Sequence, residues 1–171
     1  MRPGCAHAGT ICKRQDGYAP VRNEYMEYTQ VTAASLARAQ ERVRGTFIEL
    51  IGLHIIEVTS EHAVAEMPFM PQLQQLTGVF HAGALLTLAD TTATFACMYW
   101  SSGTIDSSAE PFPFTIQLST NLIRNTNQGT VRAEATPVHR GRTTMVVGTR
   151  VSDAAGRLLM LVTTTHLFIG T

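Results

Sequence analysis

The sequence is poor in charge, and lysine is almost absent. Only 15% of its 171 residues are charged, the 13 basic residues balance the 13 acidic ones, and Lys13 is the single lysine. Binding to nucleic-acid phosphates needs a surplus of basic residues, so the chain as a whole is not expected to bind DNA or RNA. With 44% hydrophobic residues, the composition favours a compact, oligomeric protein.

Cysteine is scarce, and hydrophobic runs are short. The three cysteines (Cys5, Cys12 and Cys97) are odd in number, so we expect no disulfide framework and a reducing cytoplasm. The sequence contains no second ligand pair with zinc-like spacing, so we also expect no metal. No run reaches the ~18 apolar residues of a membrane helix, and no secretory segment opens the chain. No dinucleotide or phosphate-loop motif is present, so no cofactor is expected.

The chain divides into two parts. Residues 1–30 are polar and show no periodicity, so we expect a poorly ordered extension without function. Residues 31–171 are predicted to form a single domain. It begins with an amphipathic helix from Thr32 or Ser35 to about Phe47, whose apolar face carries Leu36, Ala39, Val43 and Phe47. Alternation over residues 53–59 and 62–67 then predicts a hairpin.

The segment from Ala84 to Trp100 is apolar on nearly all sides, which is typical of a buried central helix. After a Ser/Gly-rich connection, turn signals separate four predicted strands over residues 114–123, 131–139, 145–151 and 158–168. An antiparallel sheet wrapped around one helix would bury most of that helix. The sequence therefore predicts an α+β fold with one long central helix.

Asp90 lies in the middle of this apolar helix. A carboxylate is costly to bury unless it is paired or hydrogen-bonded, so packing does not explain it. His81 and Gly83 fall where the helix begins, and Gly78 marks the turn into it. Unpaired backbone N–H groups at a helix start carry about half an elementary positive charge. These polar groups around an apolar helix are the best indication of function in the sequence.

The His81-Ala82-Gly83 turn, the Asp90 that follows and this order of elements resemble the hotdog fold. More narrowly, they are similar to the PaaI-like acyl-CoA thioesterases, whose motif is an H-G-G turn followed by a helix reading L-x-D or A-D. The strand Thr115-Ile-Gln-Leu-Ser-Thr-Asn-Leu-Ile-Arg124 also resembles the T-V-D-L-N-I-N-F-L-R strand of that family. The resemblance covers about residues 45–169.

The resemblance implies hydrolysis of an acyl-CoA, with Asp90 as general base or nucleophile and the Ala82 N–H as oxyanion donor. In the family the carboxylate reaches the site from the partner subunit, which implies composite sites in a homodimer or dimer of dimers. Thr115 aligns with a family Ser/Thr and would orient water. The acyl group, of short or medium chain or a small aromatic, would enter an apolar pocket beside the central helix.

Two positions depart from the family pattern. Ala82 replaces the first glycine of H-G-G, but alanine presents the same N–H wherever φ is negative. Gln75 aligns with the usual asparagine and places the same amide one methylene further out. The coenzyme A phosphates would bind at the Arg140-Gly141-Arg142 turn together with Arg124, because guanidinium groups suit phosphate. Acyl carrier protein shares the pantetheine arm and is an alternative substrate carrier.

Structural interpretations remain open for each of these residues. Asp90 could be a structural carboxylate bonded across a dimer, His81 a helix cap that positions the turn, Gln75 a loop-closing amide and Thr115 an ordinary strand residue. We interpret the remaining strand histidines as structural or solvent-facing: His54, His62, His139 and His166. Two other functions also remain open, a non-catalytic acyl-CoA sensor and, as a weaker alternative, a hotdog dehydratase or hydratase.

Overall fold

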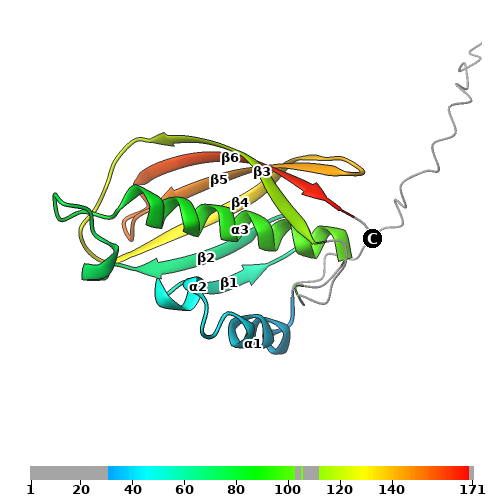
Figure 1. Ribbon diagram of the computed structural model, residues 1–171, viewed down its shortest axis with the longest axis horizontal. Coiled ribbons are helices and arrows are strands. Elements are labelled where there is room, and N and C mark those ends of the chain that lie inside the picture. Colours follow the sequence, from blue (N-terminus) through cyan, green and yellow to red (C-terminus); the bar gives the residue numbers. More distant parts are fainter. Residues whose placement is uncertain (1–30, 103–104, 106–111, 170–171) are drawn as a thin grey trace, which may run out of the picture.

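The computed structural model describes residues 31–102, 105 and 112–169, so the expected extension over residues 1–30 lies outside the described part (Figure 1). Its elements in chain order are helices α1 (Ala33–Arg42) and α2 (Phe47–Leu50), strands β1 (His54–Val58) and β2 (Ala63–Pro68), the 3-10 turn η1 (Pro71–Leu73), helix α3 (Ala82–Ser102), and strands β3 (Pro113–Leu122), β4 (Thr130–Arg140), β5 (Thr144–Ser152) and β6 (Leu158–Phe168).

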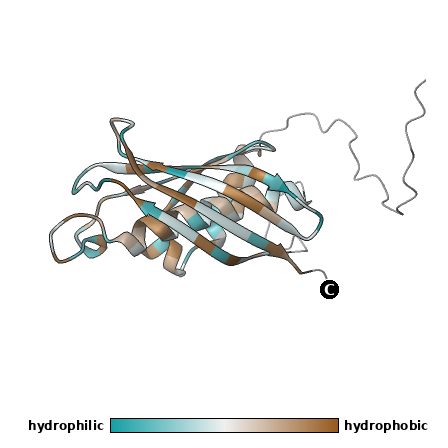
Figure 2. Cartoon of the chain, turned by 90° about the horizontal axis from the view of Figure 1, so that it is seen from above, coloured by the Kyte–Doolittle hydropathy of each residue, from teal (hydrophilic) through white to brown (hydrophobic). Residues whose placement is uncertain are grey.

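The six strands form one antiparallel sheet in the order β1-β2-β4-β5-β6-β3. Helix α3 runs along one face of this curved sheet, and the view from above shows the strands crossing over it (Figures 1 and 2). The expected α+β architecture is therefore confirmed. The hairpin and the four later strands lie within one residue of their predicted bounds, and α3 is two residues longer at each end.

The first predicted helix is shorter than expected. Helix α1 ends at Arg42, Gly45 adopts a left-handed conformation with φ of 72°, and the separate short helix α2 follows. A residue at positive φ cannot continue a right-handed helix, which is why the chain breaks there. Phe47 is consequently 59% exposed rather than part of the apolar face, so that part of the prediction was wrong.

Small side chains let the sheet approach α3 closely. In the ladder between β2 and β4, Ala63 pairs with Ala135 and Ala65 pairs with Ala133, and all four alanines are buried. Dense packing of a helix on a sheet requires such small residues where the backbones come near. The face of α3 toward this core is apolar and includes Leu85, Leu88, Ala89, Ala93, Ala96 and Cys97.

Strand β3 forms one edge of the sheet and differs from the other strands in its exposure. It pairs with β6 alone, and apolar side chains along it remain open to solvent: Phe114, Ile116, Leu118 and Leu122. An unpaired edge carrying apolar residues is a ready surface for pairing with another chain. Thr115, on the same strand, points toward α3 and brings the edge into contact with Asp90.

Candidate active site

The loop before α3 is held in a tight turn. Gly78 has φ of 81°, its N–H donates to the Gln75 carbonyl, and the Gln75 N–H donates to the Val79 carbonyl. The His81 N–H then donates to the Leu73 carbonyl at 2.7 Å, which ties the start of the helix to η1. These backbone bonds fix where the helix begins, so the direction of its free N–H groups is set by the loop.

His81 caps α3. Its ring Nδ1 accepts the Gly83 N–H at 2.9 Å, as the capping alternative for this residue required. A Cβ on Gly83 would lie 3.0 Å from that Nδ1, so a larger residue there would require the ring to shift. Because Nδ1 accepts, the proton of a neutral His81 is on Nε2. His81 is exposed, and the geometry gives it a structural contact with the turn.

The Ala82 N–H is available to a ligand. In the part of the chain that the structure describes, it has no hydrogen-bond partner, and it lies at the first position of α3. The helix dipole adds partial positive charge at this end. An N–H of this kind suits an oxyanion, and the alanine side chain does not obstruct it.

Gln75 lies in the exposed loop before the helix. Its side-chain Nε2 donates to the Thr77 hydroxyl at 2.8 Å, a bond within the loop itself. The neighbouring Leu76 is fully exposed, with a relative accessibility of 108%. Leu76 and the Gln75 amide therefore both lie at the surface of the loop that leads into α3.

Asp90 is half-buried on α3 and is held by one hydrogen bond. The Thr115 hydroxyl donates to Asp90 Oδ1 at 2.9 Å, across the space between β3 and α3. Among the described residues, the other carboxylate oxygen, Oδ2, accepts no hydrogen bond. Asp90 is therefore oriented by one oxygen and open at the other, which is the arrangement a general base or nucleophile needs.

A buried polar chain that sequence analysis missed continues behind Thr115. His166 Nδ1 lies 3.3 Å from the Thr115 hydroxyl, and its Nε2 lies 2.8 Å from the Thr164 hydroxyl. Both Thr164 and His166 are fully buried. The sequence signal was available: Thr164 and His166 occupy alternate, inward-facing positions of β6, where the other inward residues, such as Val162 and Phe168, are apolar.

Burial and the charge of Asp90 together change the ionisation of two neighbours. Desolvation lowers the pKa of His166 below its usual value, with the Asp90 charge acting in the opposite direction. Desolvation raises the pKa of the Cys97 thiol to about 12, and Asp90 adds to that shift. At neutral pH both groups are therefore uncharged, and Asp90 has no cationic partner among them.

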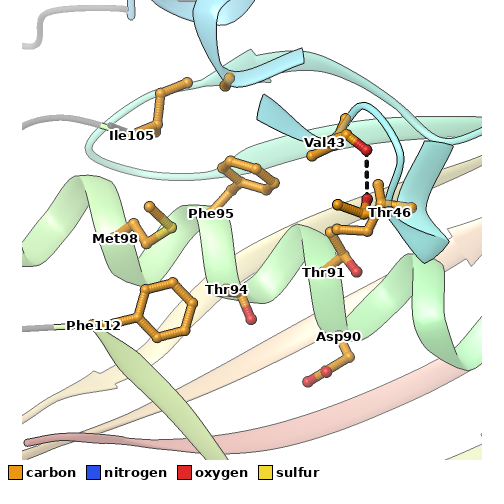
Figure 3. A pocket seen from close by; sticks show the side chains of 11 residues that line it. Val43, Thr46, Asp90, Thr91, Thr94, Phe95, Met98, Ile105 and Phe112 are labelled. Atoms are coloured by element: carbon orange, nitrogen blue, oxygen red, sulfur yellow. Dashed lines mark hydrogen bonds between the residues drawn. The ribbon is translucent and has the colours of Figure 1, made fainter. Parts of the chain in front are cut away.

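A mostly apolar pocket of about 350 Å³ opens beside Asp90 (Figure 3). It lies between α3 and the α1–α2 segment, with Asp90 at one end and Met98 and Phe112 toward the other. Eight residues of α3 separate Asp90 from Met98, so the pocket extends about 12 Å along the helix. Its remaining lining is Ala39, Val43, Thr46, Ile48, Thr91, Thr94, Phe95 and Ile105.

The predicted arginine cluster is not formed within one chain. Arg124 lies beside the start of β6, where it donates to the Leu158 carbonyl, whereas the Arg140-Gly141-Arg142 turn lies beside its end. About nine residues of β6 separate the two places, or roughly 30 Å. Within one chain β4 carries Arg140 to the far end of the sheet, so a joint role of Arg124 and this turn stays a prediction for a site shared between subunits.

The arginines of the β4–β5 turn differ in what they contact. Arg140 donates to the Ser60 carbonyl and forms an ion pair with Glu61 at 3.6 Å, so it braces the β1–β2 turn. Arg142 is exposed, and the described residues offer it no ion pair. A Cβ on Gly141 would lie 2.8 Å from the Thr144 carbonyl oxygen, so the turn requires glycine there.

Asp90 and Ala82 do not meet within one chain. They are eight residues apart on the same straight helix, about 12 Å along its axis. A thioester carbonyl within bonding distance of one is out of reach of the other.

No group of three or more metal-ligating side chains occurs in the described ranges. Of the helices that the structure describes, none has the length and apolarity to cross a membrane.

Comparisons with known proteins identify the family of this chain. The profile of the thioesterase superfamily matches residues 77–160, which include the turn, α3 and Thr115. A Bacillus subtilis protein named "Putative esterase ComA2" is 33% identical over 119 residues, covering 70% of this chain and 90% of that one. The 1,4-dihydroxy-2-naphthoyl-CoA hydrolase of Listeria monocytogenes is 26% identical over 115 residues, covering 66% and 87%.

Solved structures have the same fold. That of a glutamine-to-alanine variant of thioesterase PA1618 from Pseudomonas aeruginosa matches with a TM-score of 0.73 and 22% identity, covering 82% of this chain and 97% of that one. The PaaI protein of the Escherichia coli phenylacetic acid degradation operon matches with a TM-score of 0.67 and 23% identity, covering 79% and 91%.

Proposed function

This chain belongs to the thioesterase superfamily, whose chemistry is thioester hydrolysis, and from that premise we propose that its substrate is an acyl-CoA and its catalytic carboxylate is Asp90. The observation that carries the proposal is the position of Asp90. It is held through Oδ1 by Thr115, free at Oδ2, and placed at the end of an apolar pocket. A structural carboxylate would need no pocket, whereas a catalytic one must meet both water and an acyl group.

Hydrolysis requires a water molecule or the carboxylate itself to attack the thioester carbon. As a base, Asp90 would take a proton from water while the water oxygen bonds to carbon; as a nucleophile, its oxygen would form a mixed anhydride that water then opens. In either route the carbonyl oxygen becomes an oxyanion, the C–S bond breaks, and the coenzyme A thiolate leaves and is protonated. The Ala82 N–H would stabilise the oxyanion, a contribution worth ~100- to 1,000-fold in rate.

We propose that two subunits build each site, with Asp90 from one and Ala82 from its partner. The 12 Å separation along α3 prevents one chain from supplying both groups. Strand β3 offers the means of assembly, because it is an unpaired edge with Ile116 57% and Phe114 50% exposed. A homodimer through this edge would place the two helices side by side; a dimer of dimers would bury further surface.

The loop before α3 would complete the site from the partner's side. Gln75 lies in the loop that leads into the oxyanion donor, and we assign its amide the role of holding the carbonyl oxygen or the water. His81 and Gly83 would act by positioning the turn.

For the coenzyme A phosphates we propose Arg142 and the turn around Gly141, because Arg142 is exposed without an ion pair among the described residues. Arg140 would contribute charge while it braces the β1–β2 turn. Arg124 lies at the far end of its own sheet, so it could serve only a site on another subunit. The cytoplasm, where acyl-CoA is made and used, would be the place of action.

The acyl group would occupy the 350 Å³ pocket. An apolar cavity of about 150 Å³ is enough for benzene, so this pocket has room for a medium-length chain or a small aromatic group. Two observations favour that class: the apolar lining, and a relative named as a hydrolase of a naphthoyl-CoA, which is a fused aromatic acyl group. The likeness to PaaI in fold agrees with a PaaI-like enzyme.

The test is release of free thiol from acetyl-, hexanoyl-, octanoyl-, benzoyl- and phenylacetyl-CoA, with Asp90→Asn assayed beside the wild type. We expect turnover of at least one member and a loss of about 1,000-fold or more in the variant. Glu57→Gln, which changes a carboxylate on β1 away from the pocket, is the matched control.

Full activity in Asp90→Asn would overturn the assignment of this residue. Binding of acyl-CoA without turnover of any member would instead indicate a sensor, and loss of the conjugated double bond of an enoyl-CoA would indicate a hydratase. Hydrolysis of acyl groups carried on acyl carrier protein, in place of acyl-CoA, would identify acyl carrier protein as the physiological donor.

A further inference from the structure

We propose that His166 is a positioning residue, which fixes the Thr115 hydroxyl proton on Asp90 and thereby keeps that carboxylate in its catalytic orientation. The inference rests on the proposed role of Asp90. It concerns a residue whose sequence context indicated only a structural or exposed histidine. The buried hydrogen-bonded chain Asp90–Thr115–His166–Thr164 carries it.

The register of the sheet builds this chain. Thr115 on β3 is the direct cross-strand partner of His166 on β6. Thr164 lies two residues before His166 on the same strand, so both side chains point to the same face, toward α3. Asp90 lies above them on α3. Three elements therefore meet at one line of polar groups inside an otherwise apolar core.

The hydrogen bonds allow one arrangement of protons when His166 is neutral and Asp90 is ionised. Thr115 has a single hydroxyl proton and donates it to Asp90, so toward His166 the Thr115 oxygen can only accept. His166 therefore carries its proton on Nδ1 and presents a bare Nε2. Thr164 donates to that Nε2 at 2.8 Å, so the three hydrogen bonds of the chain are consistent with one another.

Burial keeps His166 in this neutral form. Its side chain is fully buried, and desolvation lowers its pKa although the Asp90 charge opposes the shift. The groups that face it are Asp90 from α3, Thr115 from β3 and Met145, its partner on β5, and Cys97 of α3 also interacts with the Asp90 charge. Cys97 stays a thiol because its pKa is about 12, so Asp90 is the one charge in this cluster.

Loss of His166 would change which group receives the hydrogen bond of the Thr115 hydroxyl. Without a donor on Nδ1, the Thr115 hydroxyl would be free to rotate and to donate toward position 166 instead of toward Asp90. Asp90 Oδ1 would lose its partner, and the carboxylate would no longer be held in one orientation beside the pocket. His166 would thus act on the rate of the chemical step through Thr115, with little effect on substrate binding.

Kinetics of four variants test the role. We expect His166→Leu and Thr115→Val each to lower kcat by about tenfold or more with KM nearly unchanged, since a hydrogen bond to a charged group is at stake. The double variant should be no slower than Thr115→Val alone, because both changes remove the same hydrogen bond to Asp90. His166→Asn keeps an N–H donor near the Nδ1 position and should recover much of the rate.

The matched control is Thr149→Val. Thr149 is buried on β5, and among the described residues its hydroxyl has no hydrogen-bond partner, so the change should leave kcat unaltered. Effects of His166→Leu and Thr115→Val that multiply in the double variant, or no rescue by His166→Asn in a folded protein, would overturn the proposal and leave His166 a packing residue.

A second measurement does not depend on turnover. Nitrogen chemical shifts of the His166 ring should report a neutral Nδ1–H tautomer in the wild type across neutral pH, and a changed tautomer balance in Thr115→Val. A neutral Nε2–H tautomer in the wild type would refute the inference. If the expected tautomer is found while no acyl-CoA is hydrolysed, the proposed function fails and the hydrogen-bonded chain stands as a structural feature.

Discussion

Thr115 donates a 2.9 Å hydrogen bond to Asp90, and this bond joins the exposed edge strand of the sheet to the carboxylate of the central helix. Strand β3 therefore has two roles in the proposed enzyme. Its outward apolar side chains would bind a second subunit, and its inward threonine orients the catalytic group. Assembly and catalysis should consequently depend on the same strand.

The first prediction concerns this edge. A lysine at Ile116, which is 57% exposed on β3, would place a charge in the proposed interface. We expect Ile116→Lys to be monomeric in sedimentation or light scattering and to lose nearly all turnover. Ile56→Lys, at a 42% exposed residue on the opposite edge strand β1, is the matched control and should stay assembled and active. An active monomer would contradict the shared site.

A second prediction tests which subunit supplies which group. Ala82→Pro removes the N–H assigned to the oxyanion, and proline is well tolerated at the first position of a helix. Ala82→Pro and Asp90→Asn should each be inactive as homodimers. Refolded or co-expressed together, they should regain activity, because each mixed dimer contains one site with both groups intact. If the mixture stays as inactive as its parents, both groups act from the same chain.

The third prediction concerns the pocket. Ala39→Phe fills space beneath α1, and Met98→Ala opens the end away from Asp90. We expect the first to reduce kcat/KM for octanoyl-CoA at least tenfold more than for acetyl-CoA, and the second to favour longer chains. Overpacking costs about 1–3 kcal/mol of stability, so thermal unfolding must be measured alongside. Equal losses on all chain lengths would show that the acyl group binds elsewhere.

A fourth prediction follows from the lowered pKa of His166. When the pH falls below about 6.5, the unfolded chain binds a proton at this histidine and the folded protein does not. The free energy of unfolding should then fall by up to ~1.4 kcal/mol for each pH unit until the pH reaches the lowered pKa of His166 in the folded protein. His166→Asn should lack this part of the acid destabilisation in chemical denaturation between pH 7.5 and 5.5. Identical pH slopes for both proteins would argue against a neutral buried imidazole.

Local patterns predicted most of the fold. The largely apolar segment from Ala84 to Trp100, whose only charged residue is Asp90, indicated a buried helix, and alternation together with turn signals placed each strand within one residue. Such patterns work because burial of one face is a property of short segments. The short first helix was missed because Gly45 adopts positive φ, a choice that glycine allows but does not require.

Of the candidate site, too, the sequence predicted one part and tertiary structure decided another. The amino-acid sequence by itself determined that a carboxylate lies in an apolar helix, and that a histidine and a glycine stand where this helix begins. Tertiary structure alone decided that Thr115 and His166 are cross-strand partners beneath Asp90, that α1 closes a pocket beside it, and that Arg124 and Arg140 lie at opposite ends of the sheet. The reason is physical: helix and strand periodicity are set by neighbours along the chain, whereas strand register and the packing of distant segments are set by the whole core at once.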